Sequence, residues 1–255
     1  MRTLKLLKTF FLRDMAIERA YKFRFFISAA DGLTKAVIFY FIGRHLSPAY
    51  FAYVFAGIVF GRFFHYFSSA FTNFIKHEQH RGTMDMIAAS PAGVPTAAYA
   101  AVAAGLPRFI LEISALAAAG AALGLGAKIS STPAIAAAAV ITSVFFAAIG
   151  VTFAGLAFDV KRSEQSGWLF ASLVEILSGV YFPTEALPPA LRGIASRLPT
   201  TILLDMWRAA LSGEGNGFVP VALAAAAAAL SLSAADFYFR GALRRAMKRG
   251  DASIY

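Results

Sequence analysis

The chain has 255 residues, of which 58% are hydrophobic and 15% are charged, and its mean hydropathy is +0.63. Soluble domains carry about 45–50% apolar and about 25% charged residues, so the composition excludes a disordered chain and favours a membrane protein with several spans. The absence of cysteine excludes a disulfide-held secreted domain and a cysteine-ligated metal module. The net charge of +10 suits basic loops on the cytoplasmic side of a membrane, and no nucleic-acid partner is expected.

Six stretches are predicted to cross the membrane as helices, and none alternates polar and apolar residues as a strand would. A helix needs about 20 mostly apolar residues to cross ~30 Å of hydrocarbon. The fifth stretch is short and ends at Pro183. The predicted fold class is therefore an all-α bundle. Its six spans are expected at residues 25–42, 50–71, 97–125, 134–158, 167–182 and 218–239.

The orientation of the bundle follows from where the basic residues fall. With a cytoplasmic N-terminus, two thirds of the 24 Lys and Arg residues lie in cytoplasmic segments. The basic residues left outside are Arg44, Lys128, Arg192, Arg197 and Arg208. The positive-inside rule therefore predicts a multi-pass protein of the cell (inner) membrane with both termini in the cytoplasm.

Residues 1–24 are basic and carry apolar residues at helical spacing, namely Leu4, Leu7, Phe11 and Met15. This pattern predicts an amphipathic helix that lies in the inner membrane interface, where it contacts anionic lipids. The alternative is a disordered basic tail.

Residues 76–91, between the second and third spans, are typical of a short cytoplasmic helix. Thr83 is expected to cap its start with the side-chain hydroxyl, and Asp85 is expected in its first turn. Ser90 and Pro91 end it. Such a helix suits docking against another protein, although an ordinary helical connector has the same pattern.

Prolines interrupt the segment that follows the fifth span. They divide residues 183–211 into pieces of about two helical turns, with leucine and isoleucine on one face. The prolines are Pro183, Pro188, Pro189 and Pro199. The pattern predicts short outer helices that re-enter the membrane where protein covers the broken backbone. The last piece, Ile202 to Leu211, is expected on the outer surface.

Charged residues at membrane depth are costly and are therefore candidates for pairing or for function. Asp31 with Lys35, and Arg108 with Glu112, are spaced i, i+4 and are expected to pair on one helix face. Each pair either makes insertion tolerable or faces a substrate. Glu175 has no local partner, which makes it a stronger candidate for the substrate pathway.

The second span adds Arg62 and His65 as candidates for the cytoplasmic entrance of a substrate pathway, and Arg62 and Tyr66 are candidates for the pathway itself. Extension of the Arg62 and His65 side chains to the membrane surface is the alternative. Aromatic residues crowd the first two spans from Phe39 to Phe67. They would stack on a sugar substrate or, in the more common case, face lipid and the membrane interface.

In register with this topology, two motifs resemble those of type-2 ABC exporter permeases, the ABC-2 membrane subunits of bacteria and archaea. The first is the coupling-helix motif of the first inner loop, formed here by Glu78, Arg81, Gly82, Thr83, Asp85, Ser90 and Pro91. The second is a late outer motif, formed here by Gly179, Tyr181, Phe182, Pro183, Glu185, Leu187, Pro188, Pro199 and Arg208. The resemblance covers nearly the whole chain, so residues 1–255 are expected to form one membrane domain.

The resemblance implies a permease that pairs with a second copy or a paralogue, contacts membrane lipids and binds two copies of a cytoplasmic ABC ATPase. The coupling helix would bind that ATPase. The outer gate would be formed by Pro183, Glu185, Leu187, Pro188 and Pro199. ATP and Mg would be bound by the partner, because the nearest phosphate-loop pattern, Gly124 to Lys128, has the wrong spacing. The implied activity is export of an amphipathic, lipid-linked or polysaccharide substrate by alternating access.

A multi-pass membrane enzyme acting on a lipid-linked substrate is the alternative. Asp31-Gly32 begins like a lipid head-group transferase motif, but the later paired aspartates of that motif are missing. Ser178-Gly179 is similar to an intramembrane serine protease site, yet no histidine follows His80 in the chain to act as a base. No catalytic residue and no metal-binding residue are therefore predicted.

Overall fold

The computed structural model describes residues 2–20, 22–125, 132–159, 164–212 and 218–250. Within these ranges the regular secondary structure is helical, without a strand, so the all-α fold class is confirmed. The elements are α1 (Arg2–Ala20), α2 (Lys22–Leu46), α3 (Pro48–His80), α4 (Met84–Ala89), α5 (Gly93–Ala122), α6 (Thr132–Asp159), α7 (Glu164–Leu177), the 3-10 helix η1 (Thr184–Ala186), α8 (Pro189–Ala195), α9 (Pro199–Ser212) and α10 (Phe218–Arg249).

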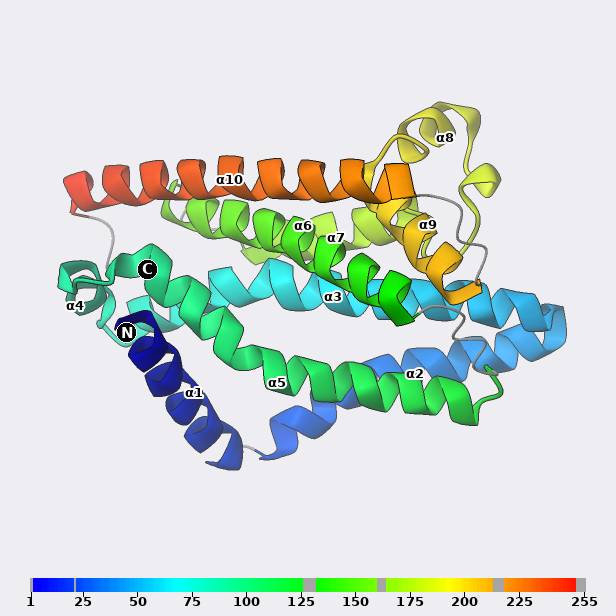
Figure 1. The fold of residues 1–255 in the computed structure, drawn as a ribbon, viewed down its shortest axis with the longest axis horizontal. Coiled ribbons are helices and arrows are strands. Elements are labelled where there is room, and N and C mark those ends of the chain that lie inside the picture. The colour runs from blue at the N-terminus through cyan, green and yellow to red at the C-terminus, as the bar shows by residue number, and fades with distance from the viewer. Residues whose placement is uncertain (1, 21, 126–131, 160–163, 213–217, 251–255) are drawn as a thin grey trace.

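The long helices run back and forth along the longest axis of the molecule (Figure 1). Helix α4 lies at one end, together with the start of α1 and the end of α10. The turn between α2 and α3 lies at the opposite end, together with α8 and α9. We call these the α4 end and the α8 end. The described chain therefore starts and finishes at the same end, as an even number of passes requires.

Within the described ranges, four helices are long and apolar enough to span a membrane, so the protein is a membrane-embedded helical bundle. The spanning segments are Ala49–His80 in α3, Gly93–Ala122 in α5, Pro133–Asp159 in α6 and Val221–Arg249 in α10. The two other predicted spans correspond to α2 and α7, both of which pack against α3. Helix α7 has 14 residues and is therefore about 21 Å long, shorter than the hydrocarbon core. Six spans remain a prediction.

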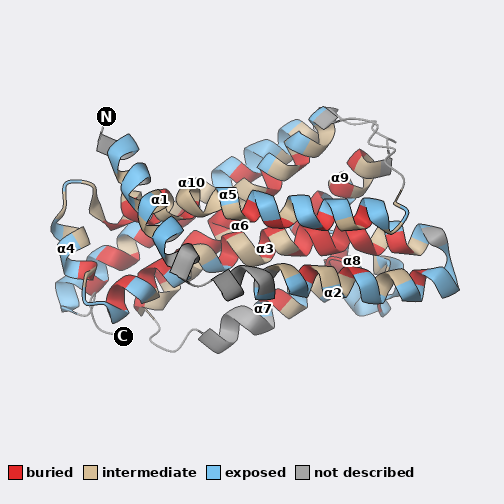
Figure 2. Ribbon diagram, turned by 90° about the horizontal axis from the view of Figure 1, so that it is seen from below, coloured by how far each residue is buried: buried red, intermediate tan, exposed pale blue. Residues whose placement is uncertain are grey.

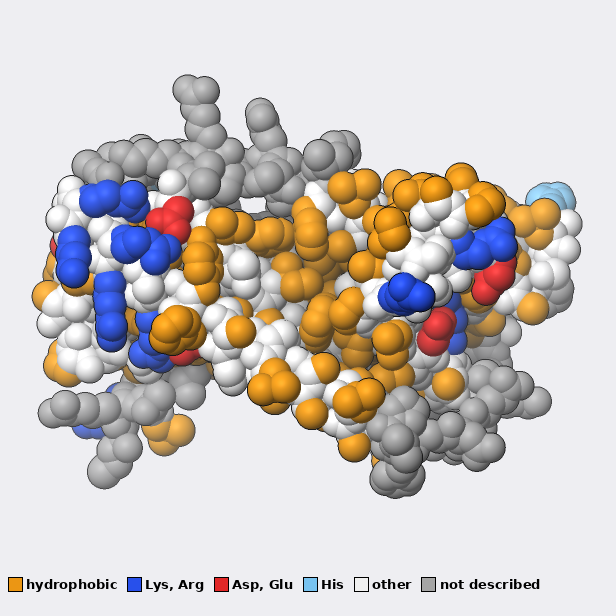
Figure 3. Space-filling model, turned by 90° about the horizontal axis from the view of Figure 1, so that it is seen from above, with side chains coloured by type: hydrophobic (Ala, Val, Ile, Leu, Met, Phe, Trp, Pro, Cys, Tyr) orange, Lys and Arg blue, Asp and Glu red, His pale blue; other side chains and the backbone are white. Residues whose placement is uncertain are grey.

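The surface changes character along the same axis (Figure 3). Lys and Arg side chains gather at the end where α10 finishes, hydrophobic side chains cover the middle, and a mixed group of charged side chains lies at the other end. The last turns of α10 contribute Arg240, Arg244, Arg245, Lys248 and Arg249. A hydrophobic middle between two charged ends matches the alternation of hydrocarbon core and aqueous interfaces that a spanning bundle meets.

Helix α3 is longer than predicted. The sequence predicts a span that ends at Phe71, whereas α3 continues to His80. Phe74 and Ile75 are buried and extend the packed face of the helix beyond the apolar stretch, which is why composition alone ends it early. The predicted bounds of the coupling helix, 76–91, are consequently wrong. Its first residues belong to α3, and only α4 forms a separate helix.

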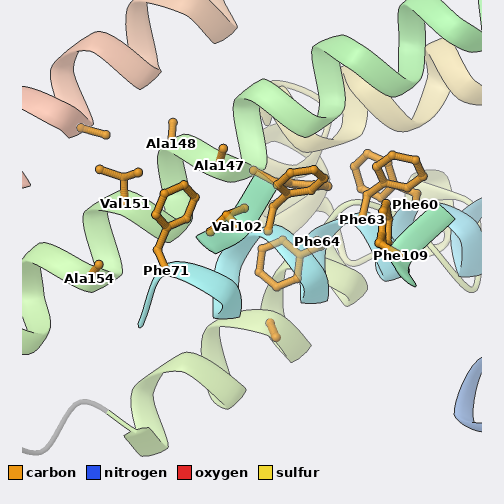
Figure 4. Close-up of a cluster of buried hydrophobic side chains, with 14 of the residues drawn as sticks. Phe60, Phe63, Phe64, Phe71, Val102, Phe109, Ala147, Ala148, Val151 and Ala154 are labelled. Carbon is orange, nitrogen blue, oxygen red and sulfur yellow. The ribbon is translucent and has the colours of Figure 1, made fainter. Parts of the chain in front are cut away.

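Helix α3 also lies at the centre of the bundle (Figure 2). Its most apolar stretch is 72% buried, against 11% for that of α10. The aromatic rings expected to face lipid or a sugar instead build the core (Figure 4). The rings of Phe60 and Phe64 meet that of Phe146 edge to face at 5.0 and 5.1 Å. Most of these rings therefore stabilise the bundle itself. The buried aromatic residues of α3 include Phe51, Phe55, Phe60, Phe63, Phe64 and Phe67.

Helix α6 crosses α3 closely at Gly150. A Cβ atom at this position would overlap the backbone carbonyl oxygen of Phe67 and press on the ring of Phe71. The absence of a side chain therefore permits the approach of the two backbones, as small residues commonly do between membrane helices.

Prolines divide the outer segment as predicted, and η1, α8 and α9 each begin at or directly after one. Helix α9 packs against α3 and α6 and buries Leu203, Leu204 and Trp207. The indole N–H of Trp207 donates to the Thr142 hydroxyl of α6 at 3.0 Å. One face of α9 is therefore internal to the bundle, and its position at the outer surface of the membrane remains a prediction. Its re-entry into the membrane remains a prediction.

Candidate functional site

The turn between α3 and α4 brings most of the predicted coupling residues together at the α4 end. Gly82 has a φ of +67°, a conformation that glycine adopts without strain, and it redirects the chain into α4. Thr83 occupies the N-cap position, but the predicted side-chain cap is absent. Its hydroxyl instead donates to the Glu78 carboxylate at 2.5 Å. Helix α4 ends at Ser90 as predicted, and Pro91 follows it.

Glu78 is a buried carboxylate that joins three elements. It lies in the last turn of α3 and is 4% exposed. Arg13 of α1 forms an ion pair with it at 2.7 Å. The Thr83 hydroxyl and backbone N–H hold the start of α4 to its carboxylate and backbone carbonyl, respectively. A buried charge is tolerated when it is paired, so Arg13 and Thr83 explain how this carboxylate is accommodated.

Asp85 and Met86 lie on the outward side of α4. Met84 is buried and anchors the helix, whereas Asp85 is exposed and Met86 is 74% exposed. Arg81 and Gly82 are exposed beside them. We call Arg81, Gly82, Asp85 and Met86 the docking face. It combines both signs of charge with a flexible apolar side chain of the kind that protein interfaces use.

A cavity of about 470 Å³ lies between α1, α3 and α5. It reaches from Glu78, near the α4 end, to Arg62 and Glu112, which corresponds to about 24 Å along α3. Of the three predicted pathway residues, Arg62 and Tyr66 line this cavity. Glu175 is not among the described residues that line it.

Arg62 connects the two ion pairs that the helical spacing predicts. Lys35 lies 3.5 Å from Asp31, and Arg108 lies 3.1 Å from Glu112, so both pairs form. The Arg62 guanidinium lies between them, 3.3 Å from Asp31 and 2.6 Å from Glu112. One charged network therefore crosses α2, α3 and α5 inside the bundle, at the far end of the cavity.

Glu175 of α7 has two partners that its local sequence does not predict. Its carboxylate lies 3.0 Å from Nε2 of His65 on α3, and it accepts a hydrogen bond from the Tyr181 hydroxyl at 2.8 Å. His65 lines the cavity, so Glu175 contacts a residue of the cavity wall.

The backbone carbonyl of Gly179 fixes the start of the outer segment. It accepts hydrogen bonds from the Tyr53 hydroxyl at 3.1 Å and from the Arg208 guanidinium at 2.7 Å. That guanidinium lies 3.5 Å from the centroid of the Tyr53 ring, and burial lowers the pKa of Arg208. The Tyr50 hydroxyl donates to the carbonyl of Tyr181 at 3.1 Å. The residues that lead from α7 into the outer segment are thus held by both α3 and α9.

The predicted gate residues lie around η1 and at the starts of α8 and α9, at the α8 end. They are Pro183, Glu185, Leu187, Pro188 and Pro199. Leu187 is buried, and Arg192 of α8 donates to the backbone carbonyl of Glu185. These residues form a folded outer cap on the bundle.

Arg13 and Met86 are the residues near these sites that sequence reasoning misses. Arg13 is one of several basic residues in α1, and 65 positions separate it from Glu78, so no local spacing reveals the pair. Met86 reads as one more apolar residue of a short helix, and its exposure follows only from the way Met84 anchors α4.

Comparison with known proteins identifies a family. The family model described as ABC-2 type transporter matches residues 3–211. The match begins in α1 and ends in α9, so it includes the docking face, the Arg62 network and the outer cap. No curated protein matches the chain.

Proposed function

Since the chain belongs to the ABC-2 type transporter family, we propose that this permease is the membrane subunit of an ATP-driven exporter. It would bind a cytoplasmic ABC ATPase subunit, which holds ATP and Mg, and pair with a second copy or a paralogue. It would lie in the cell (inner) membrane and move an amphipathic, lipid-linked or polysaccharide substrate outward by alternating access. Both termini would lie in the cytoplasm.

The observation that carries the proposal is the docking face. Met86 is 74% exposed on α4, which lies at one end of the molecule (Figure 1), away from the hydrophobic middle of the surface (Figure 3). Exposed apolar side chains within a polar rim are typical of contact with a protein partner. Asp85 adds a charge that can set the register of that contact. The α4 end would thus be cytoplasmic, in agreement with its excess of basic residues.

The cavity between α1, α3 and α5 is proposed as part of the substrate pathway. Its lining combines charged side chains, among them Arg62, Arg108 and Glu112, with aromatic side chains such as Tyr66 and Phe109. The charged side chains would contact the polar head group of an amphipathic substrate, and the aromatic side chains would contact its apolar part. Glu175 would contribute to the pathway by its contact with His65, which lines the cavity. The outer cap at the α8 end would be the gate through which the substrate leaves.

The test uses the full chain, purified from its own membrane with an affinity tag. We expect an ABC ATPase, recognised by its phosphate-loop sequence, to co-purify. Met86→Ser and Asp85→Ala are each expected to lower the amount recovered by about tenfold, because a central contact of an interface often contributes more than 1 kcal/mol.

Met247→Ser is the matched control, because Met247 is also exposed (50%) and lies in the last turns of α10 at the same end. This variant is expected to retain the ATPase. Absence of any co-purifying ATPase would contradict the proposed function. Equal loss in the Met86 and Met247 variants would contradict the assignment of the docking face.

A further inference from the structure

Helix α1 packs mainly on α5, and a charged contact and an aromatic contact also join it to α3 at the α4 end. Arg13 pairs with Glu78 at 2.7 Å. The ring of Phe10 meets that of Phe74 edge to face at 6.0 Å, and the Arg13 guanidinium lies 4.5 Å from the Phe10 centroid. Both partners, Glu78 and Phe74, belong to the last turns of α3. The middle of α1 is therefore fastened to the segment that leads into α4.

The same glutamate fastens the start of α4. The Thr83 backbone N–H donates to the Glu78 carbonyl at 3.0 Å, and the Thr83 hydroxyl donates to its carboxylate at 2.5 Å. A displacement of α4 therefore pulls on Glu78 through two hydrogen bonds. Because charge-assisted hydrogen bonds are short and strong, Arg13 would follow Glu78.

The opposite side of α1 is exposed and carries both apolar and basic side chains. Leu4 is 75% exposed and Leu12 is 57% exposed, and Lys5 and Lys8 are exposed on the same helix. This arrangement suits contact with lipid acyl chains and anionic head groups. Helix α1 thus has one side toward lipid and one side toward the coupling segment.

Helix α1 is also a wall of the cavity. Phe11, Arg13 and Met15 line it from α1, and Pro107 and Leu111 line it from α5. Pro107 lies inside α5 and cannot donate the backbone hydrogen bond of that turn. Figure 1 shows that α5 changes direction along its length. Because α1 packs on α5, a displacement of α1 with α4 would act on α5 near Pro107 and change the shape of the cavity.

We propose that the Arg13–Glu78 ion pair is a latch that makes α1 move with the coupling segment, so that ATPase-driven displacement of α4 widens or narrows the cavity between α1, α3 and α5. Arg13 is then a positioning residue of transport. This inference rests on the proposed function, because it requires an ATPase at the docking face. It adds a second route by which the motion of the partner reaches the substrate pathway.

The experiment measures the distance between α1 and α5 across the cavity. The chain contains no cysteine, so Met15→Cys and Leu111→Cys introduce the only two sites for spin labels in the permease chain, which is labelled before it is combined with the ATPase. The full permease–ATPase complex in lipid nanodiscs is studied without nucleotide and after trapping with ATP and vanadate. Pulsed electron paramagnetic resonance is expected to show a shift of the label-to-label distance between the two states.

The latch variants are made in this background. Arg13→Gln and Glu78→Gln are each expected to abolish the nucleotide-dependent shift. They should also lower permease-stimulated ATP hydrolysis by between about twofold and thirtyfold, the usual range for residues that couple distant sites. Their double variant should be no worse than the worse single variant, because both remove one interaction. Arg13→Lys keeps the charge and is expected to preserve the shift.

Arg240→Gln is the control, because it removes the charge from another ion pair, with Asp236 in α10, and should leave the shift unchanged. If an ATPase binds and hydrolyses ATP but the Glu78→Gln complex shifts as the parent does, the latch is wrong and the proposed function stands. Additive effects of the two single variants would overturn the latch as well. If no ATPase binds the unaltered chain, the latch falls together with the proposed function.

Discussion

Arg62 donates to carboxylates on two other helices, Asp31 of α2 and Glu112 of α5. The environments of these carboxylates differ, since the Asp31 side chain is 52% exposed and that of Glu112 is 8% exposed. Without the Arg62 guanidinium, the Asp31 carboxylate would still contact solvent and Lys35. The Glu112 carboxylate would still pair with Arg108, but it has little contact with water. Most of the contribution of Arg62 to stability therefore arises at Glu112.

Arg62→Ala is expected to lower the free energy of unfolding by about 1.5–3 kcal/mol, the usual contribution of a hydrogen bond to a charged group. The remaining Arg108 contact is the reason for not expecting the full cost of an unpaired buried carboxylate. The stability of Arg62→Lys should lie between that of Arg62→Ala and that of the parent, because one ammonium cannot bind both carboxylates in the fork geometry of a guanidinium. Thermal unfolding in detergent, followed by far-ultraviolet circular dichroism, measures the differences.

Arg240→Ala provides the comparison for Arg62. Arg240 pairs with Asp236 four residues earlier in α10, and its side chain is 53% exposed. An exposed pair of this kind contributes about 0–1 kcal/mol. Equal destabilisation by the two alanine variants would mean that the network inside the bundle adds nothing beyond an ordinary surface pair.

At the scale of helices, close packing of α6 on α3 depends on one missing side chain. Gly150→Ala gains helix propensity of about 1 kcal/mol but places a Cβ against the Phe67 carbonyl, which belongs to a helix backbone and cannot rotate away. Overpacking of this kind typically costs about 1–3 kcal/mol, so the net effect is expected to be destabilising. The midpoint of thermal unfolding should fall.

Gly193→Ala separates helix propensity from packing. Gly193 lies in α8, and a Cβ there would meet no atom within 4 Å, so this variant should be as stable as the parent or slightly more stable. A Gly150→Ala variant that matched Gly193→Ala in stability would show that α3 and α6 can separate without loss.

The elements could be predicted from the sequence to the extent that local pattern determines them. Apolar length identifies the long helices, Ser90 ends α4 and the prolines divide the outer segment, because each signal acts on its own neighbourhood. The i, i+4 ion pairs are local in the same sense. The end of α3 is not determined locally, because Phe74 and Ile75 extend the helix by packing against the bundle.

Contacts between helices could not be predicted, because they depend on how each helix is rotated and where it crosses its neighbours. Arg62 with Glu112, His65 with Glu175 and Arg13 with Glu78 are all of this kind. The aromatic crowd of the first two spans is another example. Aromatic rings suit lipid, a sugar or a core equally well, and the central position of α3 decides for the core.

At the scale of the whole molecule, the membrane topology depends on the direction in which each successive helix runs. Helices α3, α5, α6 and α10 are long and apolar enough to cross the membrane, and α2 and α7 run beside them (Figure 1). If α7 did not span, α8 and α9 would lie on the same side as the end of α6. Helix α10 would then carry its basic last turns to the side opposite α4, against the position of both at one end of the bundle.

The lack of cysteine allows this topology to be tested with single-cysteine variants and a membrane-impermeant maleimide on right-side-out vesicles. His45→Cys, Ala122→Cys and Arg197→Cys should react from outside, because these exposed positions lie at the outer ends of α2, α5 and α8. Lys5→Cys and Lys248→Cys should react only after permeabilisation. Labelling of position 5 from outside would contradict the prediction that α2 spans the membrane. Exchange of the results at positions 197 and 248 would remove α7, because the chain would then cross once less before α10.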